Sequence, residues 1–96
     1  MGRKVYEESW GGRGEHGSSR IEYKVSTDEI TVSFIVKEYN DWGRESQVQA
    51  DYVKEKSYPL EGKMATRDFV YECIRRAAKD LRIYSGLPDS PQKLFM

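Results

Sequence analysis

The chain has 96 residues, with 16 Lys and Arg against 16 Asp and Glu, so its formal net charge is zero. This length predicts a single domain over residues 1–96 with a thin hydrophobic core, because so small a domain buries only about 60 to 65 % of its unfolded surface. Zero net charge excludes a strong sequence-independent attraction to nucleic acids and leaves a modest electrostatic term.

The first twenty residues predict an edge strand followed by a flexible connection. Val5 and Tyr6 are placed to begin a short strand within residues 3–10. Residues 11–19 then hold four of the eight glycines in the chain. So much glycine is not expected to keep a helix or a regular strand ladder. We therefore expect residues 11–19 to form the flexible tip of a long hairpin.

The stretch from Ile21 to Tyr58 predicts three consecutive antiparallel strands. Its apolar side chains alternate with polar ones, which is the period of half-buried strands. Turn-forming residues at 26–29 and 40–43 separate the runs. The last strand is expected from residue 44 or 45 to about 55, and is the most polar of them, as suits an edge strand. The side chains expected on the core face are Ile21, Tyr23, Val25, Ile30, Val32, Phe34, Val36, Val48, Ala50 and Tyr52.

One helix is expected over residues 66–85. Thr66 is a suitable N-cap, Gly86 stands where a C′ glycine would end the helix, and Pro88 prevents its continuation. A spacing of about 100° per residue gathers one apolar face toward the sheet, made of Val70, Cys73, Ile74, Ala77, Leu81 and Tyr84.

These elements predict an α+β fold. An antiparallel β-meander of three to four strands is followed by one C-terminal helix that packs on one face of the sheet. The tail of residues 87–96 ends in Leu94, Phe95 and Met96. It is expected either to fray or to act as an arm that packs on a second subunit.

Cysteine content and hydropathy indicate the compartment. Cys73 is the one cysteine and has no intramolecular disulfide partner, so nothing requires an oxidising compartment. No run approaches the roughly 18 apolar residues of a membrane span, and no signal peptide is evident. We expect a cytoplasmic protein without membrane contact.

The sequence holds no pattern of catalytic or metal-binding residues. A zinc site needs about four ligands at short spacing, whereas one Cys and one His are present. Cys73 falls on the core side of the expected helix, where a thiol is not activated. We expect no enzyme, no metal and no cofactor.

The first interpretation of the function is a small non-enzymatic interaction module of the adaptor or inhibitor type. A thin core with seven Tyr and two Trp suggests that a second copy completes the burial, in a homodimer. A protein partner is also expected. Phe69, Arg76 and Ile83 recur at spacing seven on a helix flank that the core should not reach. With the aromatic residues, the candidate partner-binding set is Phe69, Arg76, Ile83, Trp42, Tyr39 and Trp10.

Two alternatives stay open. A single-stranded nucleic acid would need a basic groove with aromatic side chains, and the helix carries a basic stripe, which is otherwise a solvated face. Backbone N–H groups of the glycine-rich segment would instead hold a nucleotide or another phosphate ligand, although a strand rather than a helix follows them. The candidate residues for these alternatives are Arg13, Ser18, Arg20, Arg75, Lys79 and Arg82.

Overall fold

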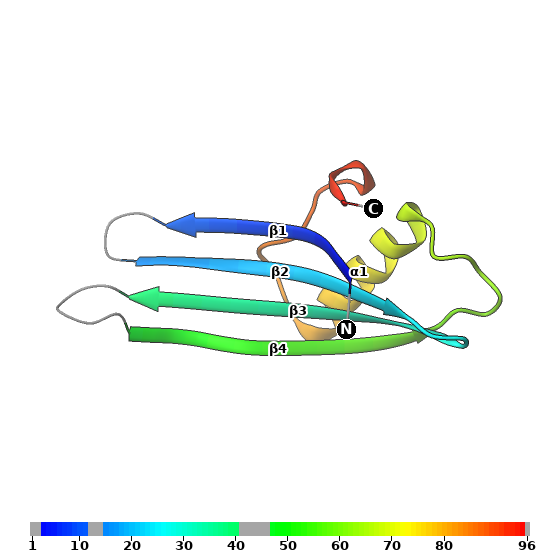
Figure 1. The fold of residues 1–96 in the computed structure, drawn as a ribbon, viewed down its shortest axis with the longest axis horizontal. Helices are drawn as coiled ribbons and strands as arrows, with labels where there is room; N and C mark the ends of the chain where they lie inside the picture. The colour runs from blue at the N-terminus through cyan, green and yellow to red at the C-terminus, as the bar shows by residue number, and fades with distance from the viewer. Residues whose placement is uncertain (1–2, 12–14, 41–46, 96) are drawn as a thin grey trace.

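Four antiparallel strands followed by one helix make up the fold in the computed structural model, which describes residues 3–11, 15–40 and 47–95 (Figure 1). The strands lie side by side in chain order, β1-β2-β3-β4. The predicted α+β class and the meander with a C-terminal helix are confirmed, with four strands. The elements are β1 Arg3–Gly11, β2 Glu15–Val25, β3 Glu29–Asn40, β4 Gln47–Pro59, α1 Arg67–Leu81 and the short 3-10 helix η1 Pro91–Lys93.

The alternation predicted for β2 and β3 is confirmed. Ile21 faces Phe34 and Tyr23 faces Val32 across the ladder, and all four side chains are buried on the helix side. Val25 departs from the prediction, with 42 % of its surface exposed, because it lies at the end of its strand. The tight turn between these strands is closed by Ser26, whose N–H donates to the Glu29 carbonyl at 2.9 Å.

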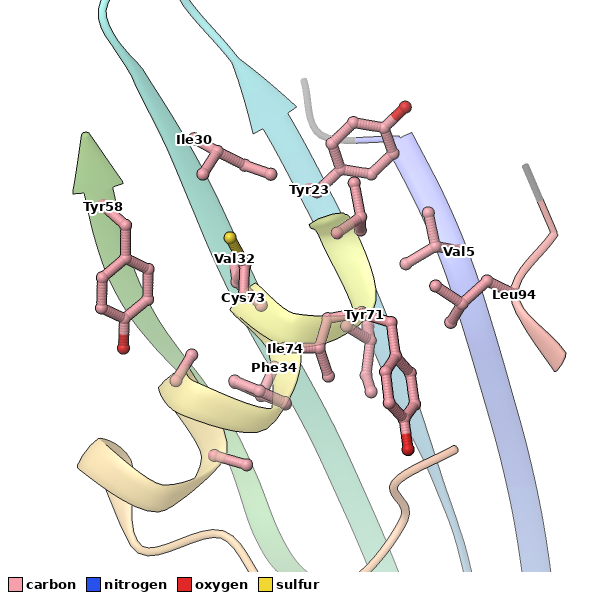
Figure 2. Packing of buried hydrophobic residues seen from close by; sticks show 14 of the residues in the cluster. Val5, Tyr23, Ile30, Val32, Phe34, Tyr58, Tyr71, Cys73, Ile74 and Leu94 are labelled. Carbon is pink, nitrogen blue, oxygen red and sulfur yellow. The ribbon is translucent and has the colours of Figure 1, made fainter. Parts of the chain in front are cut away.

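One layer of side chains between α1 and the sheet forms the core (Figure 2). Ile74 and Val70 are fully buried on the helix and belong to one buried cluster with Val32 and Ile30 of β3. The predicted helix face also gains Tyr71 and Ala78, and Leu81 packs against it partly buried. Tyr84, predicted on this face, is 83 % exposed, because it lies beyond the end of the helix.

Tyr58 connects the end of β4 to α1 through side-chain contacts. Its side chain is buried, its hydroxyl donates to the Asp80 carboxylate, and the Arg76 guanidinium lies 4.6 Å from its ring centroid. Burial, together with the hydrogen bond to Asp80, raises the pKa of the Tyr58 phenol.

The helix starts where expected but ends earlier. Thr66 is the N-cap, and its Oγ1 accepts from the Phe69 N–H at 3.2 Å. The helix ends at Leu81 because Arg82 adopts the left-handed conformation with φ 58°. The Ile83 N–H then donates to the Ala78 carbonyl at 2.8 Å, as in a Schellman ending. Gly86 is therefore not the C′ residue that the sequence suggested.

The glycine-rich segment is more regular than expected. Residues 15–20 belong to β2, residues 16–20 pair with β1, and Trp10 faces Gly17. A Cβ at Gly17 would lie 2.7 Å from the Trp10 ring, so this glycine leaves room for the indole instead of breaking the ladder. The remaining part of the predicted tip, residues 12–14, lies outside the described residues, as do residues 41–46, which include most of the second predicted turn and the predicted start of the last strand.

Two further predictions need correction. β4 continues past residue 55 to Pro59, because Tyr58 has a place in the core. The tail packs on its own chain: Leu94 is buried beside Val5 (Figure 2), and the Phe95 N–H donates to the Val5 carbonyl at 2.8 Å. This bond covers the edge of β1 at a point where its register with β2 shifts.

The sheet is much longer than the helix that covers it. The 13 residues of β4 span about 43 Å, whereas the 15 residues of α1 span about 22 Å. The molecule is accordingly elongated, 53 × 22 × 22 Å. No helix of the described residues lies beside the left-hand half of the sheet in Figure 1. We call this the distal half, made of residues 8–11, 15–19, 36–40 and 47–52.

Candidate functional site

A groove lies where the helix ends and the distal half begins. It consists of two adjoining cavities of about 240 and 350 Å³, which share Trp10, Glu38, Ser85 and Gly86 in their walls. The strands form the floor, and the segment after α1 forms one side. We call the two cavities together the Trp10 groove. Its other lining residues are Glu8, Ser19, Val36, Tyr52, Lys54, Arg82, Ile83 and Tyr84.

The strand register brings the floor together. Residues directly opposite each other in an antiparallel pair point to the same face. Trp10 faces Gly17, and Gly17 faces Glu38 on its other side. In the next row Glu8 faces Ser19, which faces Val36, which in turn faces Tyr52. Because Val36 is buried on the helix side, both rows belong to that face.

Trp10 is held in place by the glycine beneath it. The nearest ring atoms would be 2.7 and 2.9 Å from a Cβ at Gly17, so the indole packs directly on the backbone of β2. The side chain is still 42 % exposed. A large aromatic ring thus lies fixed on the sheet with part of its surface open to the groove.

Gly86 and Ser19 close the groove at its base. Gly86 has φ 73°, and a Cβ there would lie 2.5 Å from Ser19 Oγ and 3.7 Å from Glu8 Oε2. Only glycine allows this close approach with a positive φ. Ser19 is 7 % exposed, and its hydroxyl has no hydrogen-bond partner among the described residues.

Charge is divided across the groove. Among the described residues, its larger cavity is lined by two carboxylates, Glu8 and Glu38, and by no cation. The smaller cavity has Lys54 and Arg82 in its wall, with Glu38. Lys54 Nζ lies 5.1 Å from the centroid of the Tyr52 ring. No ion pair joins any of these four charged residues to another residue of the described ranges.

The predicted partner-binding residues do not form one helix flank. Ile83 lies after α1 and is 8 % exposed, because the left-handed turn at Arg82 carries it into the core. Phe69 is partly buried against the same core, and Arg76 lies over Tyr58. Ile83 therefore contributes to the wall of the groove and not to an exposed helix surface.

Of the three aromatic residues predicted to bind a partner, the structure describes Trp10 and Tyr39. Trp10 is central to the groove. Tyr39 stacks on His16 with ring centroids 5.3 Å apart, and both line a further cavity of about 230 Å³ that Trp10 also borders. Trp42 lies outside the described residues. Two of the three predicted aromatic residues are thus brought to the same end of the sheet.

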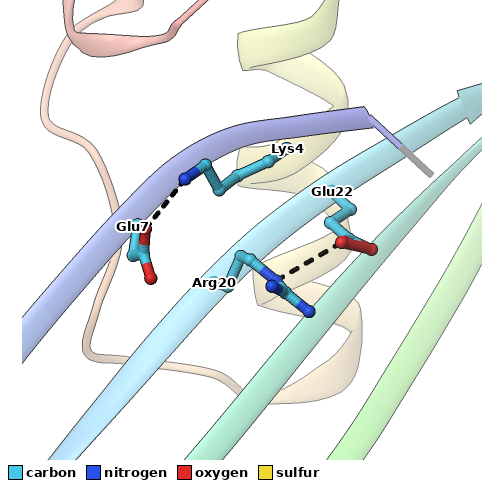
Figure 3. Close-up of polar contacts among 4 residues, drawn as sticks. All are labelled: Lys4, Glu7, Arg20 and Glu22. Atoms are coloured by element: carbon cyan, nitrogen blue, oxygen red, sulfur yellow. Dashed lines mark hydrogen bonds and ion pairs between the residues drawn. The ribbon is translucent and has the colours of Figure 1, made fainter.

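The predicted phosphate-binding residues are spread over different surfaces. Arg20 lies on the sheet face turned away from α1, with its Nε 3.3 Å from Glu22 Oε1 (Figure 3), and it lines a small cavity with Ser18 and Lys37. Arg75 and Lys79 are exposed on α1, and Arg82 lines the Trp10 groove. Arg13 lies outside the described residues. The described members of the set form no common basic site.

Several groove residues were not singled out from the sequence. Glu8 stands two positions before Trp10, so alternation alone would have placed both on one face of β1. Glu38, Ser19 and Tyr52 become neighbours only through the register, which the sequence did not specify beyond the short turn at 26–29. Tyr84 and Gly86 reach the groove because the helix ends early.

Among the described residues, no group of His, Cys, Asp and Glu is arranged to hold a metal ion. Cys73 is buried in the core, and this burial raises the pKa of its thiol, which disfavours the thiolate. Within the same part of the chain, none of the helices has the length and apolar character needed to cross a bilayer.

Comparison of the chain with protein-family models, with curated protein sequences and with solved structures finds no match in any of the three. The function is therefore inferred from the chain's own geometry and chemistry.

Proposed function

We propose that this protein is a small non-enzymatic interaction module that binds a protein partner through the Trp10 groove, as an adaptor or inhibitor. The observation that carries the proposal is that α1 stops halfway along the sheet and leaves three large aromatic side chains exposed around one groove. Trp10, Tyr52 and Tyr84 are 42, 39 and 83 % exposed. Aromatic residues are enriched in protein interfaces and at their energetic centres.

The packing of Trp10 also suits binding. A side chain that is already immobile loses little conformational entropy when a partner covers it. Because Gly17 holds the indole against the β2 backbone, burying its exposed part gives apolar contact at a low ordering cost. The neighbouring segment 82–86 is tied to α1 by the Ile83 and Arg82 backbone bonds, so one wall of the groove is fixed as well.

Protein binding is favoured over the two alternatives by the distribution of charge. Single-stranded nucleic acid and phosphate ligands need cations gathered beside aromatic or backbone groups. The aromatic groove contains Lys54 and Arg82, but Glu8 and Glu38 balance their charge. Of the predicted cations, Arg20, Arg75 and Lys79 lie on other surfaces. No described surface combines the expected cations, and we do not advance either alternative.

Affinity capture from a lysate of the source organism tests the proposal, with Trp10→Ala as the variant and Val53→Ala as the matched control. Val53 is 56 % exposed but faces Ile35 on the other side of the sheet. We expect a protein that wild type and Val53→Ala retain and Trp10→Ala loses. The proposal is wrong if Trp10→Ala retains every protein that the wild type retains.

A second copy of the chain and a cytoplasmic setting remain part of the proposal. A chain of 96 residues with a single cysteine, buried and without a disulfide, suits a reducing compartment. Exposed apolar side chains on both sheet faces, Trp10 on one and Val53 on the other, support association between copies.

A further inference from the structure

We propose that the larger cavity of the Trp10 groove accepts a lysine or arginine side chain of the partner, placed against the Trp10 ring between the carboxylates of Glu8 and Glu38. This inference rests on the proposed function, because it assigns the chemistry of the partner that the same groove would bind.

The register brings the two carboxylates to the same sheet face as the ring. Glu8 lies two residues before Trp10 on β1, about 7 Å along the strand. Glu38 lies on β3, opposite the same Gly17 that carries the indole. Both acidic side chains therefore belong to the sheet face on which the indole lies, and both line the same cavity with it. The cavity of about 350 Å³ that they line has Trp10, Ser85 and Gly86 as its other walls.

The chemistry of these walls matches an organic cation. A cation over a Trp face gains about 0.5–1 kcal/mol at an exposed site and more when it is desolvated. Carboxylates add charge-assisted hydrogen bonds, which for a guanidinium are often bidentate. Neither Glu8 nor Glu38 is neutralised by a cation of the described chain, so both are available to an incoming charge.

The base of the groove supplies an independent polar observation. The Ser19 hydroxyl is nine-tenths buried and has no hydrogen-bond partner among the described residues. It lies beside Gly86 in the adjoining smaller cavity, and Glu8 Oε2 also lies near Gly86, which lines both cavities. Buried polar groups are normally hydrogen-bonded, and an exception calls for an explanation. A donor-rich cation bound beside Glu8 brings N–H donors toward a hydroxyl that has no hydrogen-bond partner among the described residues.

The test uses the full chain with Trp42→Phe, which leaves Trp10 as the one indole. The probe is the blocked peptide acetyl-Gly-Arg-Gly-amide, and its control replaces Arg with citrulline, which keeps the shape and removes the charge. Binding is followed by Trp10 fluorescence and by the NMR signal of the Trp10 indole N–H. We expect the arginine peptide to bind at least about five-fold more tightly than the citrulline peptide, which corresponds to about 1 kcal/mol.

Matched variants then test the carboxylates. Glu8→Gln with Glu38→Gln should weaken arginine-peptide binding at least about five-fold. Glu7→Gln with Glu22→Gln makes the same change in charge on the sheet face turned away from α1 (Figure 3) and should leave binding unchanged. Equal binding of the two peptides, no binding of the arginine peptide, or equal weakening by both pairs of substitutions overturns the inference.

Capture of the protein partner by the variants distinguishes a failure of this inference from a failure of the proposed function. If capture of the partner is lost in Trp10→Ala but kept in Glu8→Gln with Glu38→Gln, the groove binds a protein and the cation site is wrong. If capture survives Trp10→Ala as well, the proposed function itself fails.

Discussion

Gly17 and Trp10 act as one unit in the distal half. Because glycine has no side chain, the indole from the neighbouring strand covers the backbone at this position, as aromatic residues do opposite glycines in other sheets. Without this pair, the groove would lose its floor and its main apolar surface.

Gly17→Ala should therefore change both stability and the groove. A methyl group 2.7 Å from the ring and from the Lys37 carbonyl must push the indole or the strand aside, and such overpacking costs about 1–3 kcal/mol. Urea unfolding measures the loss, and Trp10 fluorescence in the Trp42→Phe background reports the displaced ring. Unchanged stability and an unchanged emission maximum would show that Trp10 does not pack on Gly17.

Because the buried Ser19 hydroxyl has no hydrogen-bond partner among the described residues, its removal is expected to increase stability. Removing a buried polar group that lacks a partner is neutral or stabilising, so we expect Ser19→Ala to raise the free energy of unfolding by up to about 1 kcal/mol. Ser57→Ala is the comparison, because Ser57 Oγ shares a hydrogen bond of 2.8 Å with Thr31 and its loss should lower stability slightly. A clear loss of stability in Ser19→Ala would mean that the hydroxyl is satisfied in solution.

Tyr58 predicts how stability responds to alkaline pH. Because folding raises the pKa of its phenol, the folded chain keeps a proton that the unfolded chain loses above about pH 10. The contribution is complete below that pH and declines as pH rises further. Tyr58→Phe should lower stability at pH 7 by about 1–2 kcal/mol and flatten its decline above about pH 10.

Urea unfolding at a series of pH values from neutral to alkaline measures this dependence. Tyr84→Phe is the control, since Tyr84 is 83 % exposed and its hydroxyl makes no hydrogen bond between two elements of the described residues. A decline in Tyr58→Phe as steep as in the wild type would contradict the assignment.

At the scale of the helix, the end is decided by a buried contact and not by glycine. Arg82 accepts the left-handed conformation, which is unfavourable for a residue with a Cβ, because the turn brings Ile83 into the core. Burial of an Ile side chain is worth about 1.5–3 kcal/mol, which exceeds the backbone strain of about 1 kcal/mol. Burial of Ile83 therefore outweighs the conformational preference of Arg82.

Arg82→Gly should then stabilise the protein by about 1 kcal/mol, because glycine adopts φ 58° without strain. Arg82→Ala removes the same guanidinium but keeps the Cβ, so no such gain is expected from it. Thermal unfolding of both variants measures the difference. If both variants change stability equally, the side chain and not the backbone conformation limits this turn.

For the whole molecule, the mismatch in length between sheet and helix is the main feature. The half of the sheet beside α1 is a two-layer structure closed by α1 and by the tail, whereas no helix of the described residues covers the distal half. Two-layer burial is what usually stabilises a sheet. The distal half is therefore the part of the molecule where a partner or a second copy gains the most by binding.

Sedimentation equilibrium tests the second copy directly. We expect a mass of two chains of 11.2 kDa each, because association would cover exposed apolar side chains. Trp10→Asp and Val53→Asp should show which sheet face is covered, since the two residues lie on opposite faces of the distal half and its border. A single-chain mass at high micromolar concentration would rule out the homodimer.

Much of the fold could be predicted because its signals are local. Alternation in β2 and β3 reports side-chain burial directly, and the Thr66 cap needs only residues within one turn. The predictions of a flexible segment at residues 15–19 and of the helix end were wrong because glycine was interpreted alone. Gly17 is compatible with a strand once Trp10 lies opposite, and Gly86 lies against Ser19 and does not end the helix.

The sequence by itself thus determined the order of the strands, the class of the fold and the start of the helix, since these depend on neighbours close along the chain. Tertiary structure decided where the helix ends, how far β4 runs and which residues form the groove. Those features depend on contacts between distant residues, such as Ile83 in the core, Tyr58 with Asp80, and Trp10 on Gly17. Burial and buried hydrogen bonds at such contacts are worth up to a few kcal/mol, which outweighs the smaller local preferences that a sequence displays.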